Sequence, residues 1–185
     1  MGAYYSDLGE LRQDEVAVLS QNVNFTAKEI HALYSRFKKL DRDGTGVISR
    51  ENLLKIPELA MNPLVDRIIL CFDADEEGNI TFTSFLSCLS RLSDKGTLEQ
   101  KLSVAFRIYD INRDGFISVD EVCEILRLMV GTNMTEEQIQ RTASDTVQAA
   151  ASDGHQISTS DFHRLFQNRE DEVNRMFSVN IVTAD

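Results

Sequence analysis

Apolar residues recur at three- and four-residue spacing in several stretches of the chain, and each stretch leads into a polar segment. The clearest stretch follows Thr26. Its apolar residues, which share one helical face, are Ile30, Leu33, Tyr34, Phe37 and Leu40. Thr26 and Glu29 have the spacing of a capping box, in which each residue hydrogen-bonds the backbone of the other. The pattern therefore predicts an amphipathic helix that begins at Thr26 and ends near Asp41.

The same arrangement of helix, polar segment and helix occurs four times. The polar segments begin at Asp41, Asp73, Asp110 and Ala150. An isoleucine stands at the eighth position of each, at Ile48, Ile80, Ile117 and Ile157. A repeated unit of this size cannot bury its apolar face alone. We therefore expect an all-α fold in which four helix–loop–helix units pair into two lobes, with a short β contact between the isoleucines of paired loops.

A short linker should separate the two lobes. The best linker lies at residues 90–97 and contains Gly96. The predicted parts of the chain are an N-terminal segment at 1–24, a first lobe at 25–92, a second lobe at 93–167 and a tail at 168–185. Four apolar residues make the tail suited to covering the end of a groove: Val173, Met176, Phe177 and Val179.

The third polar segment, Asp110–Glu121, has the complete pattern of a calcium loop. Calcium prefers six to eight oxygen ligands, which a 12-residue loop supplies from positions 1, 3, 5, 7, 9 and 12. Those positions are held by Asp110, Asn112, Asp114, the backbone carbonyl of Phe116, Ser118 and Glu121. Gly115 stands at position 6, where the loop turns sharply. The sequence predicts one firm calcium site here, and magnesium is a candidate occupant at resting calcium concentrations.

Two other loops keep part of the pattern and lack the closing glutamate. The first loop retains Asp41, Asp43, Thr45 and Gly46 but ends in Asn52, whose amide offers one oxygen and no charge. The second loop retains Asp73, Asp75, Glu77 and Gly78 but ends in Ser84. We expect both to be empty or weak, and weak binding by the first loop stays open.

The fourth loop has lost most of its ligands. Ala150 stands at position 1, Gly154 at position 5 and His155 at the glycine position, whereas Asp161 remains at position 12. We expect this loop to bind no calcium and to persist as the pairing partner of the third loop.

Composition narrows the possible functions. The chain has 185 residues and a formal net charge of −11, which argues against nucleic-acid binding because that needs basic patches. Its three cysteines lie in apolar helical contexts and are expected to be buried, reduced thiols: Cys71, Cys88 and Cys123. His31, His155 and His163 have no partners suited to nucleophilic catalysis. The chain is therefore predicted not to be an enzyme.

The N-terminus carries a minimal myristoylation pattern. Gly2 is the candidate acceptor, and Ser6 stands at the required spacing. No run of 18 apolar residues follows, and no polybasic patch adjoins Gly2. We expect a cytoplasmic protein that associates with membranes reversibly at most.

Several segments resemble calcineurin B, a regulatory protein with four EF-hand helix–loop–helix units. They are the run F-K-K-L-D at 37–41, P-E-L-A-M-N-P-L-V-D-R at 57–67, E-Q-K-L-S-V-A-F-R-I-Y-D at 99–110 and L-M-V-G-T-N-M at 128–134. Two shorter runs, L-Y-S-R-F at 33–37 and S-R-E-N at 49–52, are similar to the calcineurin B homologous proteins. The resemblance to calcineurin B is the closer of the two. The calcineurin B family typically has four usable loops, whereas this chain has one convincing loop.

The resemblance implies a noncatalytic subunit whose apolar groove clasps a helix of another protein. For calcineurin B that helix belongs to the catalytic subunit of a serine/threonine phosphatase, which is the leading prediction. The alternative is a homologous-type structural subunit of an ion exchanger or cytoskeletal complex, largely independent of calcium. A soluble calcium buffer is a third possibility, but it would need several working sites.

Overall fold

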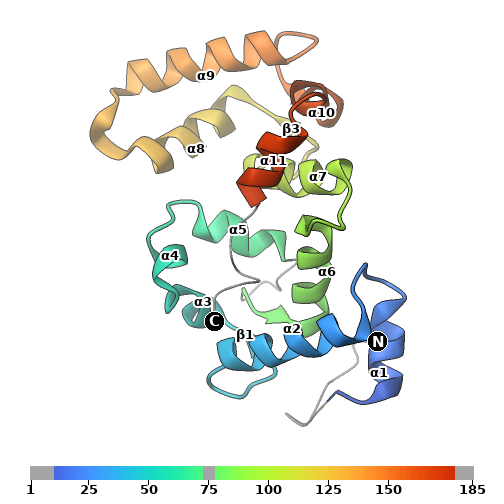
Figure 1. The fold of residues 1–185 in the computed structure, drawn as a ribbon. Coiled ribbons are helices and arrows are strands. Elements are labelled where there is room, and N and C mark those ends of the chain that lie inside the picture. The colour runs from blue at the N-terminus through green and yellow to red at the C-terminus, as the bar shows by residue number, and fades with distance from the viewer. Residues whose placement is uncertain (1–10, 73–77, 178–185) are drawn as a thin grey trace. The chain divides into compact units, whose positions relative to one another are not determined.

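The computed structural model describes residues 11–72 and 78–177. The chain divides into two compact units between Gly96 and Thr97, called the first and second lobes below. The described chain is mostly helical, and its strands are short antiparallel pairs (Figure 1). No helix within these ranges combines the length and the apolar character needed to cross a membrane.

The first lobe contains two helix–loop–helix units and a preceding helix. Its elements are α1 (Gln13–Ser20), α2 (Ala27–Leu40), β1 (Val47–Ile48), α3 (Arg50–Leu54), α4 (Pro57–Ala60), α5 (Val65–Cys71), β2 (Ile80–Thr81) and α6 (Phe82–Leu92). Helix α1 packs against α2, and α2 packs against α6. β1 and β2 are antiparallel, with Ile48 opposite Ile80.

An aromatic cluster forms the centre of the first lobe. The ring of Phe37 from α2 meets Phe82 and Phe85 of α6 edge-on, with centroids 5.3 and 5.7 Å apart. Each such pair adds about 0.5–1.5 kcal/mol to the stabilisation from burial alone. Ile30 of α2 is fully buried, and Thr26 caps the helix through the expected capping box with Glu29. The apolar face predicted from the sequence is therefore the face that holds the lobe together.

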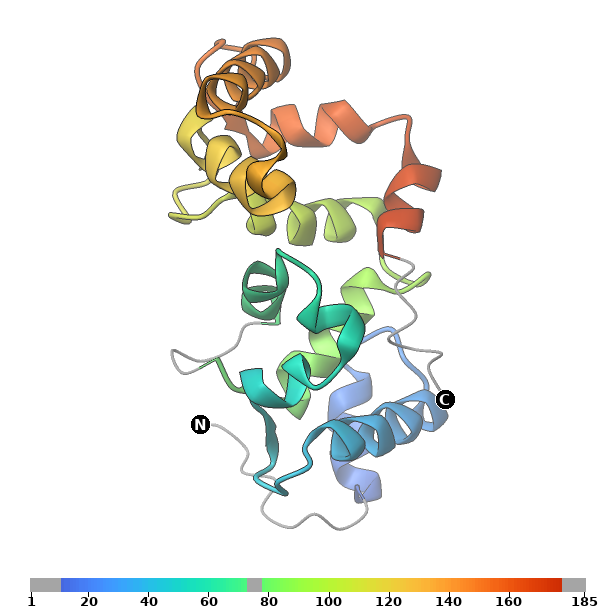
Figure 2. The ribbon, with the colours of Figure 1, turned by 90° about the vertical axis from the view of Figure 1, so that its left-hand side faces the viewer.

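The second lobe repeats the plan and adds a final helix. Its elements are α7 (Leu98–Tyr109), β3 (Phe116–Ile117), α8 (Val119–Val130), a 3₁₀ turn (Gly131–Asn133), α9 (Glu136–Ala150), β4 (Ile157–Ser158), α10 (Thr159–Phe166) and α11 (Glu170–Phe177). β3 and β4 are antiparallel, with Ile117 opposite Ile157. Helices α8 and α9 lie side by side in both ribbon views (Figures 1 and 2).

The core of the second lobe joins α7, the two strands, α9, α10 and α11. Its buried residues are Leu102, Ala105, Phe106, Ile117, Val147, Ala150, Ile157, Phe162 and Val173. The last of these, Val173, belongs to α11. Beside it, the buried Lys101 of α7 donates from Nζ to Asn174 Oδ1 at 2.7 Å. The tail helix is thus anchored to α7 by one apolar and one polar contact.

The fold class predicted from the sequence is confirmed, including both β contacts through the isoleucines of paired loops. The thiols of Cys71, Cys88 and Cys123 are buried and form no disulfide, as predicted. Helix α5 begins at Val65, after a turn in which Asn62 Oδ1 accepts from the Leu64 amide at 2.8 Å.

Both terminal segments contain helices that join a lobe. Helix α1 lies in the predicted segment 1–24, and α11 lies in the predicted tail 168–185. The domain boundaries drawn from the sequence stay a prediction. Val179 and the side chains of Met176 and Phe177 lie outside the described part of the structure, as does Gly2.

Candidate calcium site

The third loop connects α7 to α8, and its last residue is part of α8. Tyr109 ends α7, and Asp110 is its C-cap. Ser118 is the N-cap of α8, and its hydroxyl and Glu121 form a capping box. Position 9 and position 12 of the loop therefore also start the helix. A change in the contacts of the Glu121 carboxylate would therefore act directly on the first turn of α8.

Asp110 organises the turn in the middle of the loop. Its Oδ1 accepts from the Asp114 amide at 3.2 Å, and its Oδ2 accepts from the Gly115 amide at 3.1 Å. Gly115 has φ 85° and Arg113 has φ 62°, both in the left-handed region. Gly115 takes this conformation at low cost because it has no Cβ. The glycine at position 6 thus lets the loop fold over its first carboxylate.

Asn112 and Asp114 are held together at the exposed side of the loop. Asn112 Nδ2 donates to Asp114 Oδ2 at 2.9 Å, and Asn112 Oδ1 accepts from the Asp114 amide at 2.9 Å. Asp114 Oδ1 accepts from the Phe116 amide at 2.9 Å. The loop's own amides thus occupy oxygens that a metal would use.

Glu121 ties the end of the loop to its beginning. Its Oε1 accepts from the amides of Ile111 at 2.8 Å and Asn112 at 3.1 Å. Its Oε2 accepts from the Ser118 amide at 2.8 Å and hydroxyl at 2.7 Å. Burial by itself raises the pKa of Glu121, but the hydrogen bonds from Ser118, Asn112 and Ile111 outweigh it and leave the pKa below its ordinary value. The carboxylate is therefore held in its charged form.

The donor set of the third loop fits a hard cation. Its side chains offer only oxygens for coordination, and three of them are carboxylates: Asp110, Asp114 and Glu121. Asp110 and Glu121 are buried, at 6% and 7% exposure. Among the described residues no three His, Cys, Asp or Glu side chains converge as a ready metal cluster. The oxygens are in place but bound to loop amides, so a cation would replace those hydrogen bonds.

The first loop is closed by an amide in place of a glutamate. Asp41 accepts from the Thr45 amide at 3.0 Å and the Gly46 amide at 2.8 Å, as Asp110 does in the third loop. Asn52 Nδ2 donates to Asp43 Oδ2 at 3.0 Å, and Asn52 Oδ1 accepts from the Ser49 amide at 3.0 Å. In the first loop, Asn52 at position 12 therefore donates a hydrogen bond to Asp43 at position 3.

The second loop lies partly outside the described residues, which include neither Asp73, Asp75 nor Glu77. Gly78 at position 6 has φ 79°. Ser84 at position 12 accepts at Oγ from Thr81 Oγ1 at 3.1 Å and contributes to the start of α6. The short Ser84 side chain is therefore hydrogen-bonded to Thr81, the residue at position 9 of the same loop.

The fourth loop is closed by an arginine that the 12-residue pattern does not include. Arg164, on α10, donates to Ser152 Oγ at 2.8 Å and to the Ala150 carbonyl at 3.0 Å. It also pairs with Asp161 Oδ1 at 2.9 Å. Sequence reasoning missed this residue. The available signal was a basic residue three positions after Asp161 on the same helix, a spacing that brings side chains together.

Paired helix–loop–helix units of this kind define an EF-hand protein. A family model for the EF hand domain matches residues 101–129, which contain the third loop. A model for an EF-hand domain pair matches residues 44–92 of the first lobe.

Curated relatives narrow the class to one family. The chain is 44% identical over 142 residues to the calcineurin B of Naegleria gruberi, covering 77% of this chain and 80% of the relative. It is 42% identical over 137 residues to the type 1 calcineurin B of Dictyostelium discoideum, covering 74% and 76%. It is 45% identical over 124 residues to the type 2 calcineurin B of Homo sapiens, covering 67% and 73%. The chain belongs to the calcineurin B family.

Proposed function

We propose that this chain is the calcium-binding, noncatalytic regulatory subunit of a calcineurin-type serine/threonine phosphatase. The observation that carries the proposal is the complete third loop, in a chain that matches calcineurin B proteins over most of their length. These relatives do not favour the alternative of an exchanger-type or cytoskeletal subunit.

One calcium ion per chain would be held by Asp110, Asn112, Asp114, the Phe116 carbonyl, Ser118 and Glu121. When bound, the ion supplies positive charge that offsets the three ligand carboxylates, Asp110, Asp114 and Glu121. Glu121 would transmit the effect of calcium binding to α8, because it contacts both the start of the loop and the first turn of that helix. Magnesium at rest is compatible with the same oxygens.

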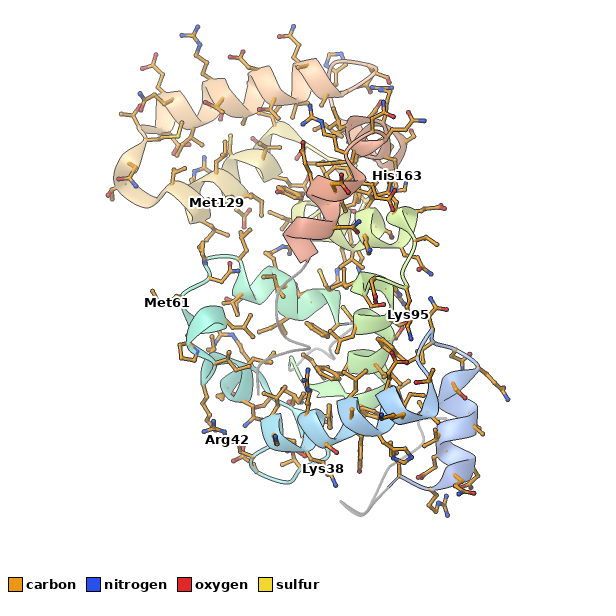
Figure 3. All side chains as sticks on the ribbon, viewed as in Figure 1. Lys38, Arg42, Met61, Lys95, Met129 and His163 are labelled. Atoms are coloured by element: carbon orange, nitrogen blue, oxygen red, sulfur yellow. The ribbon has the colours of Figure 1, made fainter. Side chains whose placement is uncertain are left out.

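Exposed apolar side chains support the binding of a helix from the catalytic subunit. Leu128 and Met129 are 44% and 56% exposed in the last turn of α8, and Met61 follows α4 in the first lobe at 84% exposure. Figure 3 labels Met61 and Met129. An apolar helix laid on the exposed residues of a lobe would remove them from water. Because α8 carries both Glu121 and Leu128, calcium at the third loop would adjust one wall of the binding surface.

A binding experiment tests the proposal. The probe is an apolar helix of about twenty residues from a calcineurin-type catalytic subunit. The protein alone should bind hydrophobic dyes and self-associate, and it should become monodisperse with the helix. Glu121→Gln should weaken the complex without abolishing it, whereas Glu124→Gln, at an exposed position of the same helix, should not. A chain that is monomeric, silent to dye and indifferent to the helix would remove the basis of the proposal.

A further inference from the structure

The fourth loop keeps the closed shape of its neighbours although it lacks their ligands. Its position 1 is Ala150 and its position 3 is Ser152. Even so, β4 leaves the loop in the correct register, with Ile157 opposite Ile117 of the third loop. Both isoleucines are buried in the core of the lobe. Something other than the usual carboxylate set must therefore hold this loop closed.

The Arg164 guanidinium joins the beginning and the end of the fourth loop. One terminal nitrogen, Nη1, donates to Ser152 Oγ at 2.8 Å. The other, Nη2, donates to the Ala150 carbonyl at 3.0 Å and lies 2.9 Å from Asp161 Oδ1. Ser152 also donates to Asp161 Oδ1. Positions 1, 3 and 12 of the loop thus converge on one cationic group.

The buried charge of Asp161 favours this contact. Asp161 is 4% exposed, and a buried carboxylate is costly unless it is hydrogen-bonded and paired. The hydrogen bonds from Ser152 and then Ser158 hold its pKa well below the ordinary range, so the group is charged. Guanidinium suits the task because its donors lie in a rigid planar fork that reaches several oxygens at once. Arg164 comes from α10, which packs on α7 in the same lobe (Figure 1).

The first loop reaches the same end by a different route. There the position 12 residue, Asn52, carries its own donor and binds Asp43 at position 3. In the fourth loop the position 12 residue is a carboxylate that can only accept, so the donor comes from one turn further along the helix.

We propose that Arg164 is the resident cation of the fourth loop, with its guanidinium in the role that calcium has in a complete EF-hand. It keeps the fourth loop closed and β4 paired with β3 without metal. The third loop is thereby held against an ordered partner strand at every calcium concentration. The metal-free part of this inference is independent of the proposed phosphatase partner, and only its effect on calcium affinity rests on the proposed third-loop site.

The test compares arginine variants of the full chain in EDTA. Arg164→Met keeps the aliphatic stem and removes the charge and the donors. Its control is Arg141→Met on α9, because the Arg141 side chain is 84% exposed, against 54% for Arg164, and its carboxylate partner is 4.0 Å away. Arg164→Met should lower the metal-free melting temperature of the second lobe by about 5 °C, the order expected for one lost charged contact in a lobe of this size. Amide exchange at the β3–β4 pair should accelerate, and calcium affinity should fall about tenfold. Arg141→Met should change none of these.

A second substitution tests whether Arg164 stabilises the loop through its charge or through the packing of its aliphatic stem. Asp161→Asn removes the charge that Arg164 offsets and supplies an amide donor like that of Asn52, so it should restore most of the stability lost in Arg164→Met. If Arg164→Met fails to fold without metal, the same rescue is measured on Arg164→Lys, which keeps the charge and loses the fork. Equal melting of the Arg164 and Arg141 variants would overturn the proposal. A loss that Asp161→Asn does not relieve would also overturn it, because the stem and not the cation would then be stabilising the loop.

Discussion

Replacing Asn52 with glutamate should make the first lobe less stable without calcium and more stable with it. In the metal-free state the substitution removes the donor that Asn52 gives Asp43 at 3.0 Å. A hydrogen bond to a charged group contributes about 1.5–3 kcal/mol. Asp43 is exposed, so solvent screening reduces the loss to about 1 kcal/mol. That corresponds to a fall in melting temperature of about 4–8 °C for a domain of this size. Capping of α3 should survive, because glutamate is the usual partner of serine in a capping box.

With calcium the sign reverses. The substituted loop would offer Asp41, Asp43, Thr45, Ser49 and the new glutamate, a set comparable to that of the third loop. Loops of this composition bind calcium with Kd of about 10⁻⁷–10⁻⁵ M. At a thousandfold excess over Kd, binding stabilises the folded state by about 4 kcal/mol, which exceeds the loss in EDTA.

Calorimetry and thermal unfolding in EDTA and in calcium measure both effects. Asn52→Gln is the matched control, because it keeps an amide and adds no charge, and it should create no site. The expected stoichiometry rises from one ion per chain to two in Asn52→Glu. An unchanged stoichiometry together with an unchanged metal-free melting temperature would refute both the loop register and the role assigned to the Asn52 amide.

Further predictions concern the contacts of Glu121, Lys101 and Glu29. Calorimetry on the unaltered chain should show one calcium ion, and Glu121→Gln should remove it. Asn174→Ala should destabilise the second lobe by about 1–3 kcal/mol by leaving the buried Lys101 ammonium without its acceptor, whereas Asn168→Ala, at an exposed position, should not. Hydrogen bonds from Lys95 and Thr26 lower the pKa of Glu29 from 4.5 to about 2. Because the folded carboxylate stays charged longer, this contribution to stability is complete above pH 4.5 and disappears as the pH falls toward 2, and Lys95→Met should flatten that part of the unfolding profile.

The sequence predicts the repeated helix–loop–helix units well because they depend on short-range geometry, whereas the calcium ligands of the third loop stay a prediction. Ligand positions within one 12-residue loop follow from residue spacing, and the paired isoleucines follow from the register of the loops. The capping box at Thr26 is equally local, and it is confirmed.

Contacts that depend on side-chain direction could not be predicted in the same way. Asn52 was judged as a weak oxygen ligand, whereas in the structure its nitrogen is the group that closes the loop. Arg164 stands outside the loop pattern, and its contacts with Ala150, Ser152 and Asp161 depend on the direction that its long side chain takes. The apolar residues of helix α1 are consecutive, at positions 16–19, and so lack helical spacing; its packing on α2, with Val16 and Leu19 buried, was therefore not evident.

The first, third and fourth loops differ in whether a hydrogen-bond donor reaches the other loop ligands from position 12 or from outside the loop. This difference decides where calcium can act. Asn52 is a donor and Asp161 is bound by the donor Arg164, so the first and fourth loops close without an added cation. Glu121 can only accept, and its four hydrogen bonds come from neutral groups of its own loop. A bound cation should therefore stabilise the third loop more than the other two. The Glu121 carboxylate is buried, and no arginine or lysine pairs with it among the described ion pairs. Glu121 lies in the first turn of α8, and we propose that Arg164 keeps the opposite strand β4 in place. The movement that calcium produces should therefore be concentrated in α8 and its exposed residues Leu128 and Met129.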